Sequence, residues 1–182
     1  MRFVIGSLVA GAVMWLLGFV FYGLLFDVGW ATAPEATQLA IQSALKALPH
    51  TGSYAIPMGE TPAMMAAHAS GPIAQVVYNA RGYPMVDPAT FIGGFVQFAV
   101  VAAMLGWLLH GLGARVDFIG QARVVIGLAA VAVVYIHLAD PVWYHADWRN
   151  AVFKSVADLV ILSAGGLVMA RWFVTRRSTG LR

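Results

Sequence analysis

Residues 3–26 read FVIGSLVAGAVMWLLGFVFYGLLF, an apolar stretch without a charged residue. At about 1.5 Å per residue, a helix of this length crosses the roughly 30 Å hydrocarbon core of a bilayer. Similar stretches follow at 88–111, 121–139 and 148–172. The pattern predicts an all-α membrane protein: a four-transmembrane-helix bundle that forms a single integral domain over residues 1–182.

The composition of the chain supports the same class. Hydrophobic residues make up 60% of its 182 residues and charged residues only 10%, against roughly a quarter charged in soluble domains. The net charge is +3, but the arginines flank the apolar stretches, so they indicate membrane orientation and not nucleic-acid binding. The chain has no cysteine, which excludes disulfides, thiolate metal sites and covalent c-type haem. We expect a lipid bilayer as partner and no nucleic acid.

The first apolar stretch resembles a secretory signal, because Ala31-Thr32-Ala33 looks like a small-residue cleavage site. A signal peptide has an apolar region of only about 7 to 15 residues, however, and this stretch is longer. We therefore expect an uncleaved membrane anchor.

Residues 27–87 are rich in proline, glycine and polar residues and predict an extramembrane insertion. Pro34-Glu35 fits the first turn of a helix, and Pro49 ends it. Residues 51–57 and 73–78 have the composition of short strands. We expect a small cap of one helix and a β-hairpin. Because a lone hairpin is marginal in water, it must lean on the membrane surface or on another subunit.

The distribution of charges predicts orientation. One side of the four stretches carries basic residues with a single acid, Asp117; the basic residues are Arg2, Arg115, Arg123, Arg171, Arg176, Arg177 and Arg182. The other side is mostly acidic, with Lys46, Arg81 and Arg149 against Asp27, Glu35, Glu60, Asp87, Asp140 and Asp147. By the positive-inside rule both termini lie in the cytoplasm, and the insertion is extracytoplasmic. The last three stretches have short connections, which predict antiparallel neighbours.

Small and polar residues mark the expected contacts between helices, since helices in lipid associate through close backbone approach and polar contacts. These residues are Ser7, Gly11, Gly18, Gly94, Gln97 and Gly165. They predict either internal packing or a surface that docks a neighbouring protein, and the two are compatible.

Lys154 and Asp158 lie four residues apart inside the fourth stretch, so they share a helix face and form a predicted intramembrane ion pair. Ionisable residues at such depth are costly and point to function. The structural alternative is a pair that snorkels outward and fixes helix register. A proton or ion path needs polar partners on other helices, and Gln97 and Tyr135 are the candidates.

Histidines and acids gather at the predicted outer interface. His137, Asp140 and His145 are the candidate metal ligands, but their spacing matches no zinc signature. The accompanying aromatic residues are typical of an interfacial belt, which explains the cluster better than a metal does. A haem held by His137 and His145 is the remaining cofactor hypothesis; His110 falls in the opposite leaflet from His137. Without a nucleophile motif, we expect no enzyme activity and no cofactor.

The order of elements resembles uncharacterised families of small four-span bacterial membrane proteins. The resemblance is carried by Leu48-Pro49, by residues 52–57, and by Gly71-Pro72 through Tyr78 and Gly82, followed by three closely spaced stretches. It implies an inner-membrane location and no known activity.

Three functional hypotheses follow. The leading one is a non-catalytic structural or accessory subunit, or assembly partner, of a larger membrane complex. The first alternative is a small transporter or proton-linked protein that uses Lys154 and Asp158. The second is a haem- or metal-binding membrane protein that uses His137 and His145.

Overall fold

The computed structural model describes residues 1–112 and 116–174. The chain is 73% helical, with a small two-stranded sheet. Within these described residues, four helical segments are long and apolar enough to cross a membrane, as predicted: Arg2–Leu24, Pro88–Leu112, Phe118–Tyr144 and Trp148–Phe173. Four of the basic residues used to predict orientation, Arg115, Arg176, Arg177 and Arg182, lie outside the described residues.

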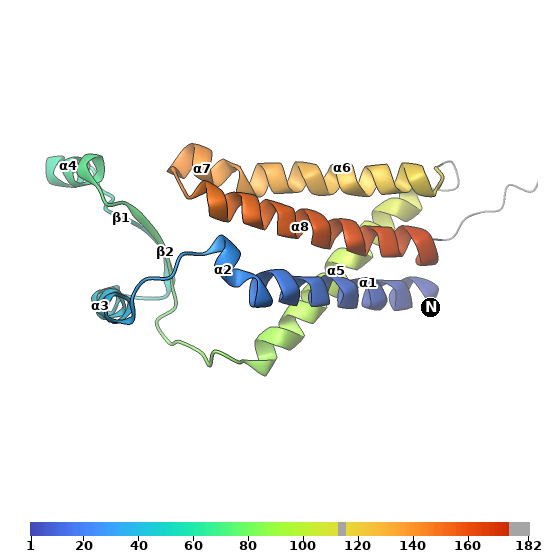
Figure 1. Cartoon of the computed structure of the whole chain (residues 1–182), viewed down its shortest axis with the longest axis horizontal. Helices are drawn as coiled ribbons and strands as arrows, with labels where there is room; N and C mark the ends of the chain where they lie inside the picture. Colours follow the sequence, from blue (N-terminus) through green and yellow to red (C-terminus); the bar gives the residue numbers. More distant parts are fainter. Residues whose placement is uncertain (113–115, 175–182) are drawn as a thin grey trace, which may run out of the picture. The chain divides into compact units, whose positions relative to one another are not determined.

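Three of the four spans are composed of more than one helical element (Figure 1). The second span is the single helix α5 (Pro88–Leu112). The first consists of α1 (Arg2–Phe19) and the π-helical turn η1 (Val20–Leu24), followed by the short α2 (Phe26–Gly29). The third consists of α6 (Phe118–His137) and α7 (Ala139–Tyr144), and the fourth of α8 (Trp148–Val168) and a second π-helical turn, η3 (Met169–Phe173).

The third span is longer at both ends than residues 121–139. It begins at Phe118 because the Asp117 side chain caps the helix and accepts a hydrogen bond from the Gly120 N–H at 2.8 Å. Pro141 lies inside the third span and does not end it. The backbone bends at Leu138, and Pro141 then lies in the first turn of α7, where a missing N–H costs no helical hydrogen bond.

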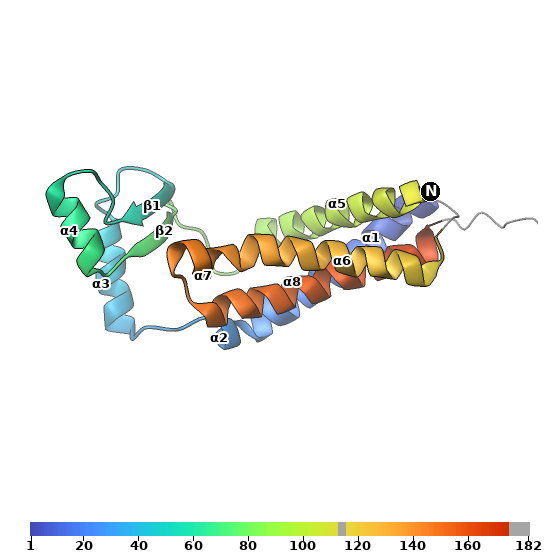
Figure 2. The same ribbon diagram turned by 90° about the horizontal axis from the view of Figure 1, so that it is seen from above.

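The spans do not contact one another equally. α1 packs against both α5 and α8, and α6 packs against α8 (Figure 2). α5 and α6 touch little although only a short connection separates them, so the expectation that they are close neighbours is wrong. The arrangement follows from α1, where Gly11 lies so close to α5 that an added Cβ would come within 2.7 Å of the Ala99 Cα.

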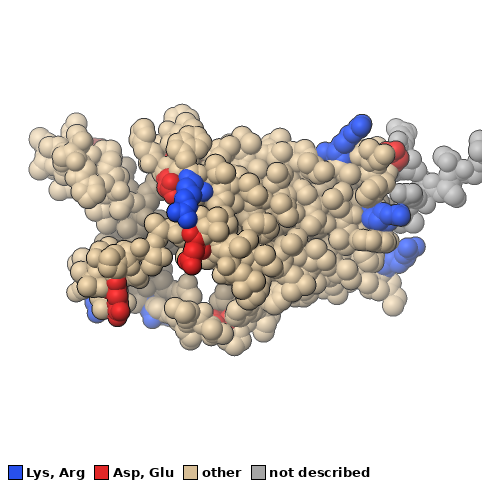
Figure 3. Space-filling view, viewed as in Figure 1, with Lys and Arg blue, Asp and Glu red and all other residues tan. Residues whose placement is uncertain are grey.

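Large side chains packed against small residues form the core of the helices. Met14, Leu109, Ile161 and Met169 are the largest fully buried side chains. The Met14 side chain packs against Gly165, that of Met169 against Gly106 and that of Val125 against Gly166. Outside this core the surface is apolar, and Figure 3 shows a broad band along the helices without a Lys, Arg, Asp or Glu side chain. Such a band fits a lipid environment.

The chain divides into two compact units. Met1–Ala31 and Pro88–Arg182 form the membrane unit, and Thr32–Asp87 forms the second unit, which we call the cap. The predicted insertion began at residue 27, but α2 belongs to the membrane unit because α8 holds its carbonyls, as described below.

The cap contains α3 (Glu35–Leu45), β1 (Gly52–Ile56), α4 (Pro62–Ser70) and β2 (Ala74–Tyr78). The strands are antiparallel, with Ser53 opposite Val77. The sequence pattern predicted α3 and both strands, but no helix was predicted at α4. Its signal is Thr61-Pro62: the Thr61 hydroxyl accepts a hydrogen bond from the Met64 N–H at 3.3 Å, and proline occupies the first helical position.

Candidate functional site

The Asp158 carboxylate contacts polar side chains from two other spans of the membrane unit. Its Oδ1 accepts a hydrogen bond from the Tyr22 hydroxyl at 2.7 Å. Its Oδ2 lies 2.7 Å from the Nε2 of His137. Tyr22 comes from η1, His137 from the end of α6 and Asp158 from α8, so one carboxylate joins three of the four spans. We call these three residues the Asp158 centre.

The π-helical turn η1 determines which way Tyr22 points. Leu25 donates its N–H to the Val20 carbonyl, five residues back, at 3.0 Å. This inserts one extra residue into the turn and changes the direction of the side chains that follow α1. An uninterrupted helical periodicity therefore does not predict the contact between Tyr22 and Asp158.

His137 reaches Asp158 because the third span continues beyond it. The span ends at Tyr144, seven residues later, which places His137 roughly 10 Å inside it at 1.5 Å per residue. Asp158 lies ten residues after Trp148, the start of α8, or about 15 Å along that helix. The apolar pattern predicted a span that ends at residue 139, with His137 at the interface, so it did not predict this shared depth. The exposed fraction is 15% for the His137 side chain and 33% for that of Asp158.

Lys154 has a different partner from the one predicted. Its Nζ lies over the indole of Trp30, 5.5 Å from the ring centroid. Within residues 1–112 and 116–174, the side chain of opposite potential charge found at Asp158 is His137, not Lys154. Trp30 also stacks on Phe26 at 4.6 Å and meets the rings of Tyr22 and Phe153 edge-on. Lys154 thus sits one helical turn from Asp158, on an aromatic cluster that includes Tyr22.

The start of α8 also holds α2. The Arg149 guanidinium donates to the carbonyls of Val28 and Asp27, each at 2.7 Å, and the Asn150 amide donates to Gly29 at 3.0 Å. Because α2 ends there, these carbonyls have no helical donor of their own. Successive turns of α8 therefore fix the end of the first span in the order Asn150, Lys154, Asp158.

The other candidates for a proton path lie on the outside. Tyr135 is 82% exposed, and Gln97 is exposed on α5. Neither belongs to the Asp158 centre, in which Tyr22 and His137 are the partners of the carboxylate.

The candidate metal ligands do not converge. His137 directs its Nε2 to Asp158, whereas His145 is exposed and ends α7 with a left-handed backbone. Over the described part of the chain, no three His, Asp or Glu side chains come together as ligands of one metal ion. His110 is exposed near the end of α5.

Most of the predicted packing residues lie between helices. Ser7 is buried and donates its hydroxyl to the Phe3 carbonyl at 3.0 Å. Gly11 faces Ala99, Gly18 faces Phe98 and Gly165 faces Met14, while Gly94 is in looser contact with Trp15. Gln97 is the exception, because the buried positions of α5 (Ala102, Leu105, Gly106 and Leu109) recur on a different face of that helix.

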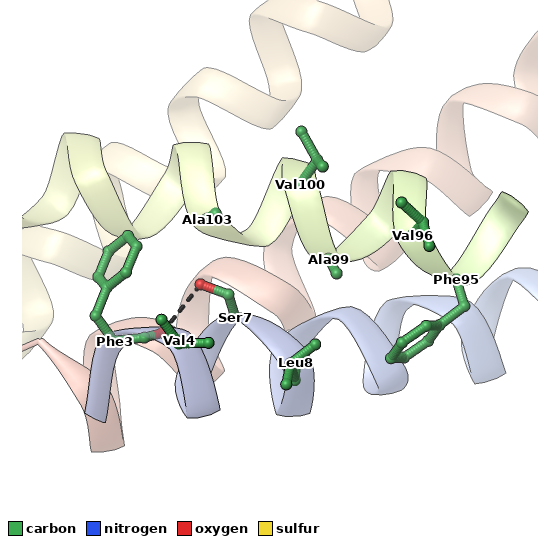
Figure 4. Close-up of a pocket in the computed structure, with 9 residues that line it drawn as sticks. All are labelled: Phe3, Val4, Ser7, Leu8, Phe95, Val96, Ala99, Val100 and Ala103. Atoms are coloured by element: carbon green, nitrogen blue, oxygen red, sulfur yellow. Dashed lines mark hydrogen bonds between the residues drawn. The ribbon is translucent and has the colours of Figure 1, made fainter. Parts of the chain in front are cut away.

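A shallow apolar groove runs between α1 and α5 (Figure 4). Phenylalanine side chains of the two helices, Phe3 and Phe95, lie toward its two ends, and Ala99 and Ala103 lie between. Its one polar side chain, Ser7, uses its hydroxyl within α1. The groove offers only apolar surface, as a face toward lipid acyl chains does.

The cap differs from the membrane unit in having no interior. No residue of Thr32–Asp87 is buried. One sheet face carries the half-buried Tyr54 and Tyr78, whose ring centroids are 6.4 Å apart, but on the other face Val77 is 90% exposed. The large apolar residues that the cap exposes are Leu39, Ile41, Ile56, Met58, Met64, Met65, Ile73, Val77, Tyr83, Met85 and Val86.

Comparison of the chain with protein-family models, with curated proteins and with solved structures finds no match.

Proposed function

We propose that this chain is a non-catalytic integral membrane protein that serves as an accessory subunit or assembly partner of a larger membrane complex. The observation that carries the proposal is the cap, a folded unit without a buried residue. The partner binds the cap, and the membrane unit anchors it.

The energetics of the cap favour a covered state. Ordering a backbone costs about 1–2 kcal/mol per residue, and buried apolar surface is the main term that offsets this cost. The cap has two helices and a two-stranded sheet to order, yet its apolar side chains remain exposed. A protein surface that covers Val77, Met65 and Met85 supplies the missing burial.

The charge of the cap favours a protein over the bilayer surface as its cover. Glu35, Glu60 and Asp87 exceed Lys46 and Arg81 by one negative charge. Peripheral attachment to an anionic membrane depends on clustered lysines and arginines, which the cap lacks. An apolar protein surface has no such requirement.

We further propose a bacterial inner-membrane location with both termini in the cytoplasm. The charge bias of the sequence supports this orientation: Arg2, Arg123 and Arg171 lie toward one side, and Asp140 and Asp147 toward the other. The cap is then extracytoplasmic, and its partner has an extracytoplasmic surface.

The experiment is a native gel of membranes solubilised in mild detergent, followed by detection of this chain. We expect a band well above the monomer for the wild type. Val77→Asp places a charge on the exposed sheet face, and Met85→Asp does the same at a fully exposed loop position without disturbing a strand. Both substitutions should release the monomer.

Gln42→Asp is the matched control, because it adds the same charge at an exposed polar position of α3. It should leave the complex intact. Limited proteolysis of each purified variant checks that the cap stays folded. A wild type that migrates only as a free monomer contradicts the proposal, as does a complex that both Val77→Asp and Met85→Asp leave unchanged.

A further inference from the structure

The Asp158 centre has a chemistry that an accessory scaffold does not require. We propose that it is a proton-binding site: the His137–Asp158 pair takes up and releases one proton, and Lys154 compensates the charge of the released state. This inference is independent of what covers the cap.

The hydrogen bonds limit which protonation states the pair can adopt. The Tyr22 hydroxyl has its hydrogen directed at Oδ1, so Asp158 acts there as an acceptor. At Oδ2 the 2.7 Å contact with Nε2 requires one hydrogen between the two atoms. An imidazolium beside a carboxylate satisfies both contacts and leaves the pair with no net charge.

Release of a proton changes the charge of the pair but not its hydrogen bonds. The imidazolium loses the proton on Nδ1, the ring nitrogen turned away from Asp158, and keeps the N–H on Nε2. The electron pair of the broken N–H bond stays on the ring, and a water molecule that reaches Nδ1 accepts the proton. A neutral imidazole and a carboxylate with a net charge of −1 remain, and Tyr22 still donates its O–H.

The groups around the centre are suited to these two states. Besides Tyr22 from η1 and His137 from α6, the ionisable side chain on the facing turn of α8 is Lys154. Asp140, three residues beyond His137 in the half-exposed α7, is the acid nearest in sequence. A net negative charge away from water is costly unless a cation stands close. Lys154, four residues before Asp158 on the same helix face, is the cation to which we assign this role, and its Nζ lies over the Trp30 ring.

The alternative is that the Asp158 centre has only a structural role, as a static clamp that joins three spans. A clamp needs hydrogen bonds and packing, but it does not need Lys154 as a compensating cation. It therefore predicts that Lys154→Met leaves the behaviour of the His137 ring unchanged, and this difference can be measured.

The test is nitrogen NMR of the purified full chain in lipid nanodiscs, with ¹⁵N-labelled histidine and the proton itself as ligand. The chain has five histidines, and His137→Gln assigns the signal of the site. We expect the ring nitrogens of His137 to show a single one-proton transition between about pH 4 and 9, a range that brackets the usual titration of histidine.

Variants then identify the partners. Asp158→Asn removes the counter-charge of the imidazolium, so the transition should move to lower pH. Lys154→Met removes the cation that favours the released state, so the transition should move to higher pH. Tyr22→Phe should move it in the same direction as Lys154→Met, because the carboxylate loses a donor. His145→Gln, at the exposed residue that follows α7, should leave it unchanged.

Two results overturn the proposal: a His137 ring whose signals stay constant from about pH 4 to 9 in the wild type, and a transition that Asp158→Asn leaves in place. If Asp158→Asn fails to insert or fold, the proposal is tested with Lys154→Met and Tyr22→Phe. A transition at the wild-type pH in both variants then contradicts the site.

Discussion

The membrane unit and the cap belong to one chain, but they differ in how far each buries its own side chains and supplies them with partners. The membrane unit buries Met14, Leu109 and Ile161, and the carboxylate of Asp158 has partners on two other spans. The cap buries no side chain. The comparison shows that the helices of the membrane unit bury side chains against one another, whereas the cap leaves its large apolar side chains exposed. In the function proposed above, a partner protein supplies the surface that covers them.

Close helix packing in the membrane unit gives the largest expected effect. Gly11→Leu pushes a side chain into the Ala99 backbone, so we expect a loss of about 3 kcal/mol in the free energy of unfolding. Gly93→Leu makes the same change where an added Cβ meets nothing within 4 Å and should cost little. Unfolding in mixed detergent micelles measures both. Equal losses would show that α1 and α5 are not packed as described.

The Asp158 centre gives the next effect. Tyr22→Phe removes a hydrogen bond to a carboxylate, so we expect a loss of about 2 kcal/mol in the free energy of unfolding. Tyr135→Phe removes the same hydroxyl from an exposed ring and should stay within about 0.5 kcal/mol of the wild type. The same unfolding assay compares them. If both variants match the wild type, the centre does not support the fold.

A smaller effect is expected in the cap. Thr61→Ala removes the N-terminal hydrogen bond of α4, which costs about 1 kcal/mol locally. Amide hydrogen exchange should show faster exchange in α4 and unchanged exchange in α8. Faster amide exchange in both units at once would contradict their description as separate units.

The two units also differ in how far the sequence predicted them. Length and hydropathy predicted the four spans, because a bilayer demands long apolar helices whatever their contacts. Asp158 and Lys154 stood out for the opposite reason, as ionisable residues in an apolar stretch. In the cap, proline and strand composition predicted α3, β1 and β2, and Thr61-Pro62 carries the signal for α4 that was overlooked.

Contacts between elements were the part that sequence did not predict. Tyr22 reaches Asp158 through the π-helical turn η1, which local periodicity does not reveal. His137 reaches it because Pro141 sits in the first turn of α7, and so the span continues. Gln97 has the residue type of a packing position, but the face that α5 turns inward is set by α1 and η3, far away in sequence.

The central claim, that a protein partner covers the cap, is tested most directly by cysteine labelling. Because the chain has no native cysteine, Val77→Cys gives a single reactive site at a position that is 90% exposed. A water-soluble maleimide is applied to the purified protein in detergent, to the purified protein in liposomes of native lipids, and to permeabilised native membranes. We predict rapid labelling in the first two samples and protection in the third. Rapid labelling in native membranes, or protection already in liposomes without a partner, would contradict the account.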